Sequence, residues 1–233
     1  MKKLTLTFLI ILYTLASNVV LSADYNKGLN AYNNGDFANA LGEFKPLAEQ
    51  GDDDAQFFLG LMYEKGQGIP QDYDTAVKWY TLSAEQGDSD SQNNLGLIFA
   101  QGEKMPQDHR TALKWFRLSA EQGSKNGQSN LGVMYLNGYA VPMDYKVALK
   151  WFRLSAEQGY NYAHYNISEM YEKGYGVLQD NIYAHIWGNI AAANGIEEGA
   201  EIRDRVEEKM TSADISEAQK LARECIAKNY KGC

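Results

Sequence analysis

The sequence of 233 residues has few cysteines, prolines and histidines, and each shortage excludes a class of protein. Two cysteines are too few for a disulfide-dense scaffold or for a four-cysteine zinc site. The patterns Gly-x-Ser-x-Gly, His-Glu-x-x-His, Cys-x-x-Cys and Ser-x-x-Lys do not occur. His164 and His185 lack an evident third ligand, so we predict structural roles for them. The sequence therefore predicts no enzyme, no cofactor and no bound metal.

Positive charge is also scarce, with 22 Lys and Arg against 30 Asp and Glu, a net charge of -8. Such a chain repels phosphate backbones and anionic lipid surfaces, so we expect neither nucleic acid nor a membrane surface as a partner. The hydrophobic fraction of 45% is sufficient for a packed core, which argues against disorder. Glycine, at 21 residues against 4 prolines, indicates regularly spaced turns.

One long apolar run stands at the N-terminus. Lys2 and Lys3 precede a mostly apolar stretch, 4–21, and Ala23 ends a small-residue cleavage site. This order is typical of a secretory signal peptide, 1–23, although an uncleaved membrane anchor is the alternative. Cleavage would leave a mature chain, 24–233, with a net charge of -10, because two lysines are removed. We expect a periplasmic or secreted protein without stable membrane insertion.

A period of 36 residues dominates the rest of the chain. Glu-Gln-Gly recurs at 49–51, 85–87, 121–123 and 157–159, and the 12 residues at 112–123 recur letter for letter at 148–159. The same step separates four tryptophans: Trp79, Trp115, Trp151 and Trp187. The period divides the chain into a short unit and four full ones: 24–51, 52–87, 88–123, 124–159 and 160–195.

Each unit has the pattern of two helices, here called helix A and helix B. Apolar residues at fourfold steps place one face of helix A in the core, as in Ala55, Leu59 and Tyr63. Glycine and proline in 66–70 end that helix, and Asp72 is placed to cap helix B. We expect the tryptophan column to fill the gaps between neighbouring helices.

These columns resemble the Sel-one-like repeat (SLR) family, a relative of the tetratricopeptide repeats. Unit 52–87 matches its pattern at Ala55, Leu59, Gly60, Tyr63, Gly66, Gly68, Asp72, Ala76, Trp79, Ala84 and Gly87. Lys104 and Ala140 replace the second loop glycine, and Ser168 replaces the glycine of helix A. The resemblance implies an all-α, right-handed superhelical α/α solenoid of about five helix pairs, acting as an adaptor and often exported in bacteria.

Beyond the repeats, 196–233 has the pattern of a polar helical cap. We predict helices over 197–210 and 212–229, with a buried stripe of Ile202, Val206, Met210, Ile215, Leu221 and Ile226. Seven residues separate Cys225 from Cys233, a spacing that a helix-to-tail disulfide can close. In an oxidising compartment the two cysteines can be bridged or free, and the sequence leaves both open.

Helix A positions that differ between units are the candidate binding surface, since the concave face of such a stack is lined mainly by helices A. The candidates form three columns: Phe57, Asn93, Ser129 and Tyr165; Glu64, Ala100, Leu136 and Glu172; Gln56, Gln92, Gln128 and His164. We predict that a protein or peptide binds there.

The same columns can also be variable solvent-facing residues without a ligand. Two other functions stay open: an enzyme acting on cell-wall or β-lactam substrates, as linked to cysteine-rich exported members of the family, and a secreted host-contact factor. The first lacks support here, because per-repeat cysteine pairs are missing.

Overall fold

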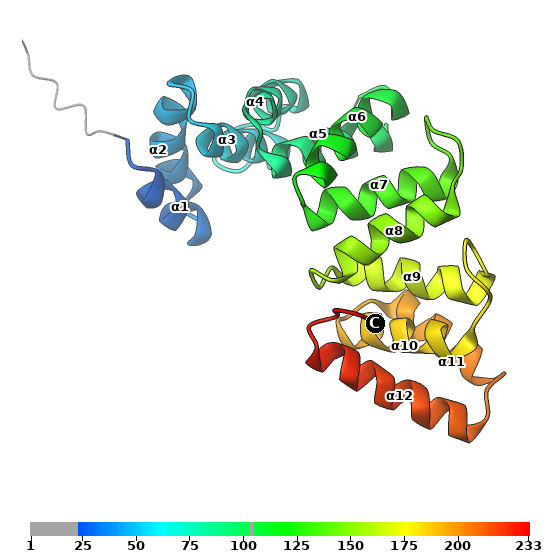
Figure 1. Cartoon of the computed structure of the whole chain (residues 1–233). Helices are drawn as coiled ribbons and strands as arrows, with labels where there is room; N and C mark the ends of the chain where they lie inside the picture. Colours follow the sequence, from blue (N-terminus) through cyan, green and yellow to red (C-terminus); the bar gives the residue numbers. More distant parts are fainter. Residues whose placement is uncertain (1–22, 103–104) are drawn as a thin grey trace, which may run out of the picture.

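The computed structural model describes residues 23–102 and 105–233, which form twelve helices and no strand (Figure 1). Apart from Ala23, the predicted leader lies outside the described residues. No helix in the described ranges is both long and apolar enough to cross a membrane. The helices are α1 Tyr25–Asn33, α2 Phe37–Glu49, α3 Asp53–Lys65, α4 Tyr73–Gln86, α5 Ser89–Gln101, α6 His109–Glu121, α7 Lys125–Asn137, α8 Tyr145–Ala156, α9 Asn161–Lys173, α10 Asn181–Ala193, α11 Glu197–Glu207 and α12 Ser212–Ala227.

Consecutive helices form pairs, and the pairs stack into an arched solenoid (Figure 1). Helices A of the full units are α3, α5, α7 and α9, and helices B are α4, α6, α8 and α10. Each helix B contacts its own helix A and also the helix A of the next unit, as α6 does with α5 and α7. This confirms the all-helical solenoid expected from the period.

Short polar residues and glycines set the helix ends. Asp72 accepts a hydrogen bond from the backbone N–H of Thr75 and so caps α4. Its counterparts one, two and three repeats on cap α6, α8 and α10 in the same way: Asp108, Asp144 and Asp180. Helices A end at glycines with positive φ, a conformation that only glycine adopts without strain. The 36-residue period therefore fixes where each helix starts and stops.

Within a unit, a glycine on helix A lies against an aromatic ring on helix B. A Cβ at Gly96 would lie 2.4 Å from the ring of Phe116, and one at Gly132 would lie 2.6 Å from that of Phe152. Gly60 and Tyr80 repeat the arrangement. In the first three full units the buried ring is thus the residue after the tryptophan, since Tyr80 and Phe152 are 0% exposed and Phe116 is 2% exposed. Close backbone approach explains the glycines.

In the last unit the small residue lies on helix B instead of helix A. Ser168 stands in the glycine column, and its hydroxyl donates to the carbonyl of Ala184 at 2.7 Å. Gly188 stands in the aromatic column, where a Cβ would lie 2.8 Å from the carbonyl oxygen of Gly199. α11 can therefore pack closely against α10 and begin the cap.

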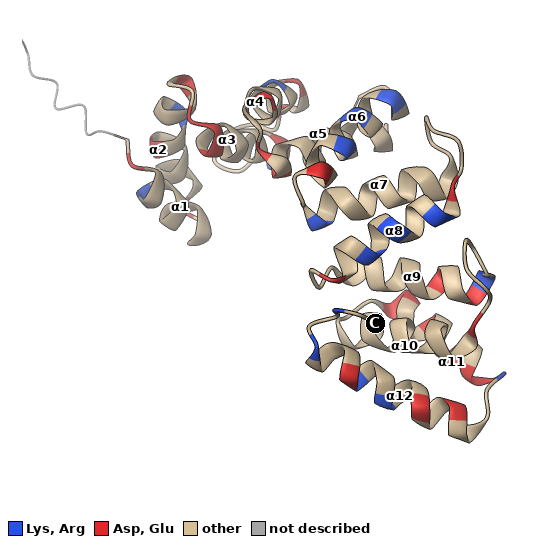
Figure 2. Cartoon of the chain, in the orientation of Figure 1, with Lys and Arg blue, Asp and Glu red and all other residues tan. Residues whose placement is uncertain are grey.

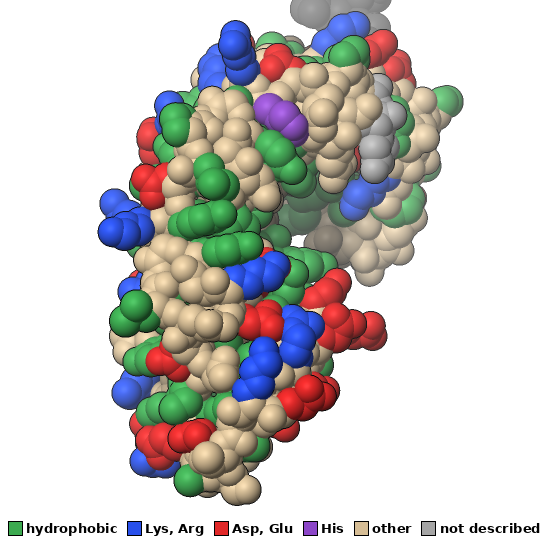
Figure 3. All heavy atoms as spheres, turned by 90° about the vertical axis from the view of Figure 1, so that its right-hand side faces the viewer, with side chains coloured by type: hydrophobic (Ala, Val, Ile, Leu, Met, Phe, Trp, Pro, Cys, Tyr) green, Lys and Arg blue, Asp and Glu red, His purple; other side chains and the backbone are tan. Residues whose placement is uncertain are grey.

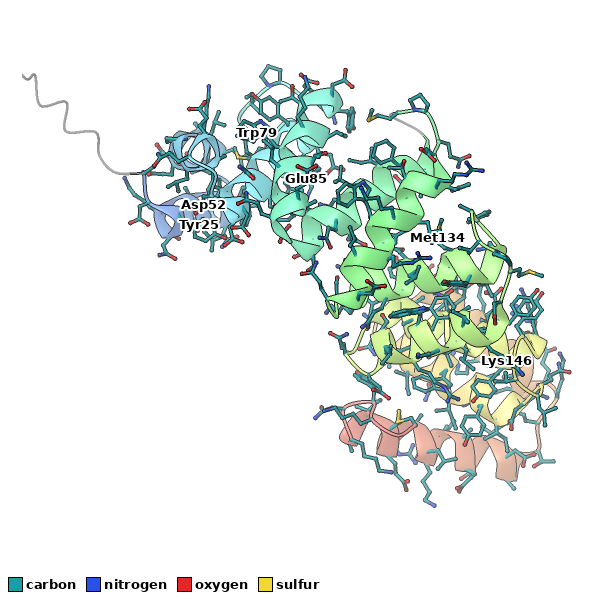
Figure 4. The ribbon with its side chains drawn as sticks, turned by 45° about the horizontal axis from the view of Figure 1, so that its top comes forward. Tyr25, Asp52, Trp79, Glu85, Met134 and Lys146 are labelled. Atoms are coloured by element: carbon teal, nitrogen blue, oxygen red, sulfur yellow. A yellow bond between two sulfur atoms is a disulfide. The ribbon has the colours of Figure 1, made fainter. Side chains whose placement is uncertain are left out.

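The tryptophans pack between units, but to different depths. Trp115 and Trp187 are buried, whereas Trp79 and Trp151 are only half-buried. Trp79, labelled in Figure 4, packs against the core that α2 and α3 form between two units. The tryptophans therefore lie between helices as predicted. The most deeply buried rings, however, are those of the next residue along: Tyr80, Phe116 and Phe152.

The ends of the stack are closed differently. At the N-terminus, Phe58 of α3 stacks on Phe44 with ring centroids 4.8 Å apart, and Tyr25 and Tyr32 of α1 cover it. Pro46 lies inside α2. At the C-terminus, α11 packs on α9 and α10, and α12 packs on α10.

The predicted stripe in the cap is right for α11 and only partly right for α12, where Leu221 packs against the core and Ile226 does not. Ile202 and Val206 are buried, but Ile226 is 41% exposed and Ile215 and Leu221 are only partly buried. α12 instead buries Ala218, Ala222 and Cys225, because small side chains allow it to approach α10 closely. Cys225 and Cys233 form a disulfide, which closes the final turn.

Candidate functional site

One member of the predicted column Phe57, Asn93, Ser129 and Tyr165, namely Asn93, lies at the seam where two neighbouring helices A meet. α5 contacts α7 directly, and the side-chain N–H of Asn130 donates to Oδ1 of Asn93 across that contact at 2.8 Å. Asn93 and Ser129 are consequently buried, at 5% and 3% exposure, whereas Phe57 and Tyr165 are half-buried. Only the two aromatic members present appreciable surface.

The column Gln56, Gln92, Gln128 and His164 is buried and joins one unit to the one before it. Nε2 of Gln92 donates to the carbonyl of Ala84 at 3.0 Å, and Oε1 of Gln92 accepts from Gln122 at 2.7 Å. Gln56 and Gln128 make the same pair of contacts one unit earlier and later. These amides hold the stack together, so we leave the column out of the proposed binding surface.

His164 takes the fourth position in that column. One ring nitrogen, Nε2, lies 3.2 Å from the carbonyl oxygen of Ala156, and the ring packs against Trp187 and Tyr230. Burial lowers the pKa of His164 to about 4, although the hydrogen bond to Ala156 acts in the opposite direction. His185 pairs with a different group, since its Nε2 lies 2.7 Å from a carboxylate oxygen of Glu207 in α11.

The two carboxylates of the remaining column also have partners. Glu64 accepts a hydrogen bond from the Tyr80 hydroxyl at 2.7 Å. Burial, followed by the Glu64 charge, raises the pKa of Tyr80. Glu172 is 9% exposed and forms a two-point ion pair with Arg205 of α11, which lowers the pKa of Glu172. Glu172 therefore ties the cap to the last unit. Their counterparts Ala100 and Leu136 are half-buried.

The accessible part of the helix A face lies one residue further along each helix. Asn94, Asn130 and Asn166 occupy one 36-residue column and are half-buried. Leu97 and Val133, one turn on, are also half-buried. We call Asn94, Leu97, Asn130 and Val133 the inner face. These three asparagines recur at the 36-residue period, so they are visible in the sequence. They are not among the predicted site residues, because those are chosen as positions that differ between units.

One edge of this inner face is acidic. Asp52 and Asp53 lie near Asp54, and Asp88 contributes from the next unit (Asp52 is labelled in Figure 4). Burial first, and then these neighbouring charges, raise the pKa of Asp54. Burial and Asp88 also raise the pKa of Asp90.

The loops between helices A and B form a second, aromatic edge. His109 stacks on Tyr139, and Tyr145 stacks on Tyr175, each pair with ring centroids 4.5 Å apart. Figure 3 views the side where these loops project and shows hydrophobic side chains between patches of charge. In residues 23–102 and 105–233, no three His, Cys, Asp or Glu side chains gather as a metal would require.

Comparison with known proteins identifies the repeat. The family model described as Sel1 repeat matches residues 53–88, 89–124, 126–160 and 161–196, more than half of the chain. No curated protein matches the sequence.

Solved structures agree with this match. A protective antigen with an SLR fold from uropathogenic Escherichia coli strains is 37% identical, with a TM-score of 0.78 over 82% of this chain and 41% of that one. A Sel1 repeat protein from Oxalobacter formigenes is 31% identical, with a TM-score of 0.68 over 76% of this chain and 72% of that one. This chain thus spans less than half of the antigen's length. An immunity protein from Pseudomonas aeruginosa, 16% identical with a TM-score of 0.52 over 88% of this chain and 83% of that one, shares the fold alone.

Proposed function

Because the chain belongs to the Sel1 repeat family, whose members generally mediate protein–protein interactions, we propose that it is a non-catalytic scaffold that binds a peptide segment of a partner protein on its inner face. We further propose that this face is the concave side of the arch. Direct contacts of α5 with α7 and of α9 with α11 support this, since elements on the inside of a curve approach one another most closely.

The observation that carries the proposal is the half-buried pair Asn94 and Asn130 on adjacent helices A, with Leu97 and Val133 beside them. An asparagine amide has two N–H donors and an acceptor oxygen, so Asn130, which gives one N–H to Asn93, still has a donor and an acceptor that can pair with the backbone of an extended peptide whatever its sequence. Aliphatic side chains beside the amides can bury apolar groups of that peptide. Phe57 and Tyr165, the aromatic candidates with surface to offer, flank these helices on α3 and α9. The acidic edge formed by Asp52, Asp53 and Asp54 favours a segment with Lys or Arg at that end.

Export is the second part of the proposal. The N-terminal stretch 1–23 has the order of a signal peptide, and the Cys225–Cys233 disulfide suits an oxidising compartment. The E. coli relative is a protective antigen. We expect the protein recovered from the periplasm or medium to begin at Asp24, which intact mass measurement of the fractionated protein checks. Recovery of the full-length chain in the cytoplasm would contradict export.

Site-specific photocrosslinking tests the binding face. A benzophenone amino acid placed at Asn94 or Asn130 should give a discrete adduct in cells, whereas the same group at Leu82, 46% exposed on α4, should not. With the purified partner, the double variant Asn94→Ala, Asn130→Ala should bind at least tenfold more weakly. Equal adducts from Leu82, or unchanged affinity of the double variant, would place binding elsewhere.

A further inference from the structure

Six of the basic residues are concentrated on two helices B. α6 carries Arg110, Lys114 and Arg117, and α8 carries Lys146, Lys150 and Arg153, each 36 residues later. With Glu121 as their only carboxylate, α6 and α8 together have a net charge of +5 in a chain of -8. Figure 2 shows this positive charge along both helices.

Within the part of the chain that the structure describes, these cations are exposed and none forms an ion pair, although the charge of Arg110 contributes to the lowered pKa of Asp108. The ion pairs there involve Lys27, Lys173, His185, Arg203, Arg205 and Lys220, and none of the six. Lys114 lies over the ring of Trp115, and Arg153 donates to the Tyr171 hydroxyl at 2.8 Å. All six residues are exposed, so their charge acts outward rather than within the fold.

On α8 the charges line a shallow, open groove, which we call the outer groove. Its lining consists of Lys146, Leu149, Lys150, Arg153, Leu154 and Gly176. Gly176 lies so close to the backbone of Tyr145 that a Cβ there would be 2.8 Å from its carbonyl carbon. The loop after α9 therefore forms a fixed wall, beside which Leu154 remains 37% exposed. Lys146, at the start of α8, is labelled in Figure 4.

We propose that the outer groove binds an acidic helical segment of a partner protein. Lys146, Lys150 and Arg153 are spaced i, i+4 and i+7, so they lie along one face of α8 over about 10 Å. A second helix with Asp or Glu at the same spacing would place one carboxylate beside each cation. A leucine or similar side chain on that helix would cover Leu154.

The charge distribution favours a protein over an anionic lipid surface. The positive zone is concentrated on two helices, and exposed Asp144 and Glu157 border it at the two ends of α8. The rest of the chain has a net charge of -13, which a broad anionic surface would repel. A single acidic helix can lie in the groove without meeting that repulsion. The site is on helix B and does not use the inner face, so it is separate from the function proposed above.

A designed probe tests this inference: a fluorescein-labelled, 20-residue alanine-based helix with Glu at i, i+4, i+7 and i+11 and one Leu. We expect salt-sensitive binding measured by anisotropy. The variant Lys146→Glu, Lys150→Glu should bind at least tenfold more weakly. The control Lys45→Glu, Lys78→Glu makes the same charge change on α2 and α4 and should stay within threefold of wild type. Circular dichroism melts check folding, and Lys146→Gln, Lys150→Gln replaces the double variant if it unfolds.

Three results would overturn the inference. The first is equal loss of probe binding in the two charge-reversal variants, which would indicate net charge rather than a groove. The second is undiminished binding of the same peptide with Gln in place of each Glu. The third is no binding of the acidic peptide while phosphatidylglycerol vesicles bind the wild type. The variant Asn94→Ala, Asn130→Ala should retain peptide binding, which separates this test from that of the inner face.

Discussion

His164 should make the folded protein sensitive to mild acid, and His164→Gln should remove that sensitivity. The ring is 0% exposed, and burial lowers its pKa to about 4 from 6.5. The unfolded chain therefore binds a proton more readily than the folded one between these values. The contribution of neutral His164 is fully present above about pH 6.5 and is lost as the pH falls toward 4.

The size of the effect follows from the two pKa values. At pH 4.5 they imply a loss of about 2.5 kcal/mol in the free energy of unfolding relative to neutral pH. Glutamine is the natural replacement, because Gln56, Gln92 and Gln128 occupy the same column. Its amide can donate to the carbonyl of Ala156 as Gln92 does to that of Ala84, and it does not titrate.

Urea unfolding at pH 7.5 and 4.5 measures the change. Wild type should lose about 2–3 kcal/mol more than His164→Gln over this interval, while carboxylates common to both proteins cancel. His109→Gln, which replaces the half-buried histidine of the loop edge, controls for loss of any histidine. Parallel losses in wild type and His164→Gln would refute the argument, whatever their absolute stabilities.

Three further predictions concern packing and the cap. Phe152→Ala should cost about 3–5 kcal/mol in urea unfolding, because it empties the space against helix A, whereas Leu154→Ala, at an exposed site, should change stability by less than about 0.5 kcal/mol. Replacing Cys225 and Cys233 together by Ser should cost about 2.5 kcal/mol, and a wild type whose melt is unaffected by a reductant would contradict this. Glu172→Gln should cost about 1–2 kcal/mol at pH 7. The difference in the free energy of unfolding between wild type and Glu172→Gln should decrease as the pH falls through the lowered pKa of the Glu172 carboxyl. A difference that stays constant down to pH 3 would exclude the ion pair as its cause.

The sequence predicted the fold well because its period repeats the features that start, stop and pack a helix. Asp72 and its counterparts act locally, through the N–H groups of the next turn, so a motif alone places them. The contact of a glycine with an aromatic ring, as between Gly60 and Tyr80, likewise recurs at the 36-residue period and is visible in the sequence. The cap has no period, and α12 accordingly faces α10 with alanines that a search for large apolar residues passes over.

The candidate site was harder to predict, since a column that varies between units can face a neighbouring helix as well as solvent. Asn93 and Ser129 belong to a column that varies between units, yet both are buried, and Asn93 bonds to Asn130 of the next helix A. Gln92 recurs because it satisfies a carbonyl of the preceding unit. Telling these roles apart requires the stacking geometry between units, which spacing within one unit does not contain.

The glutamine contacts between units have an evolutionary consequence. The segment from Ala112 to Gly123 recurs unchanged from Ala148 to Gly159, and the joints on either side use the same amide and carbonyl groups. Recombination between the two copies would remove or add 36 residues and leave the glutamine–carbonyl contacts between the remaining units intact, whereas removal would replace the contact of Asn93 with Asn130 by one between two different helices A. The length of the arch can thus change by a whole unit, with new side-chain packing required where helices A and their loops meet rather than at the glutamine contacts.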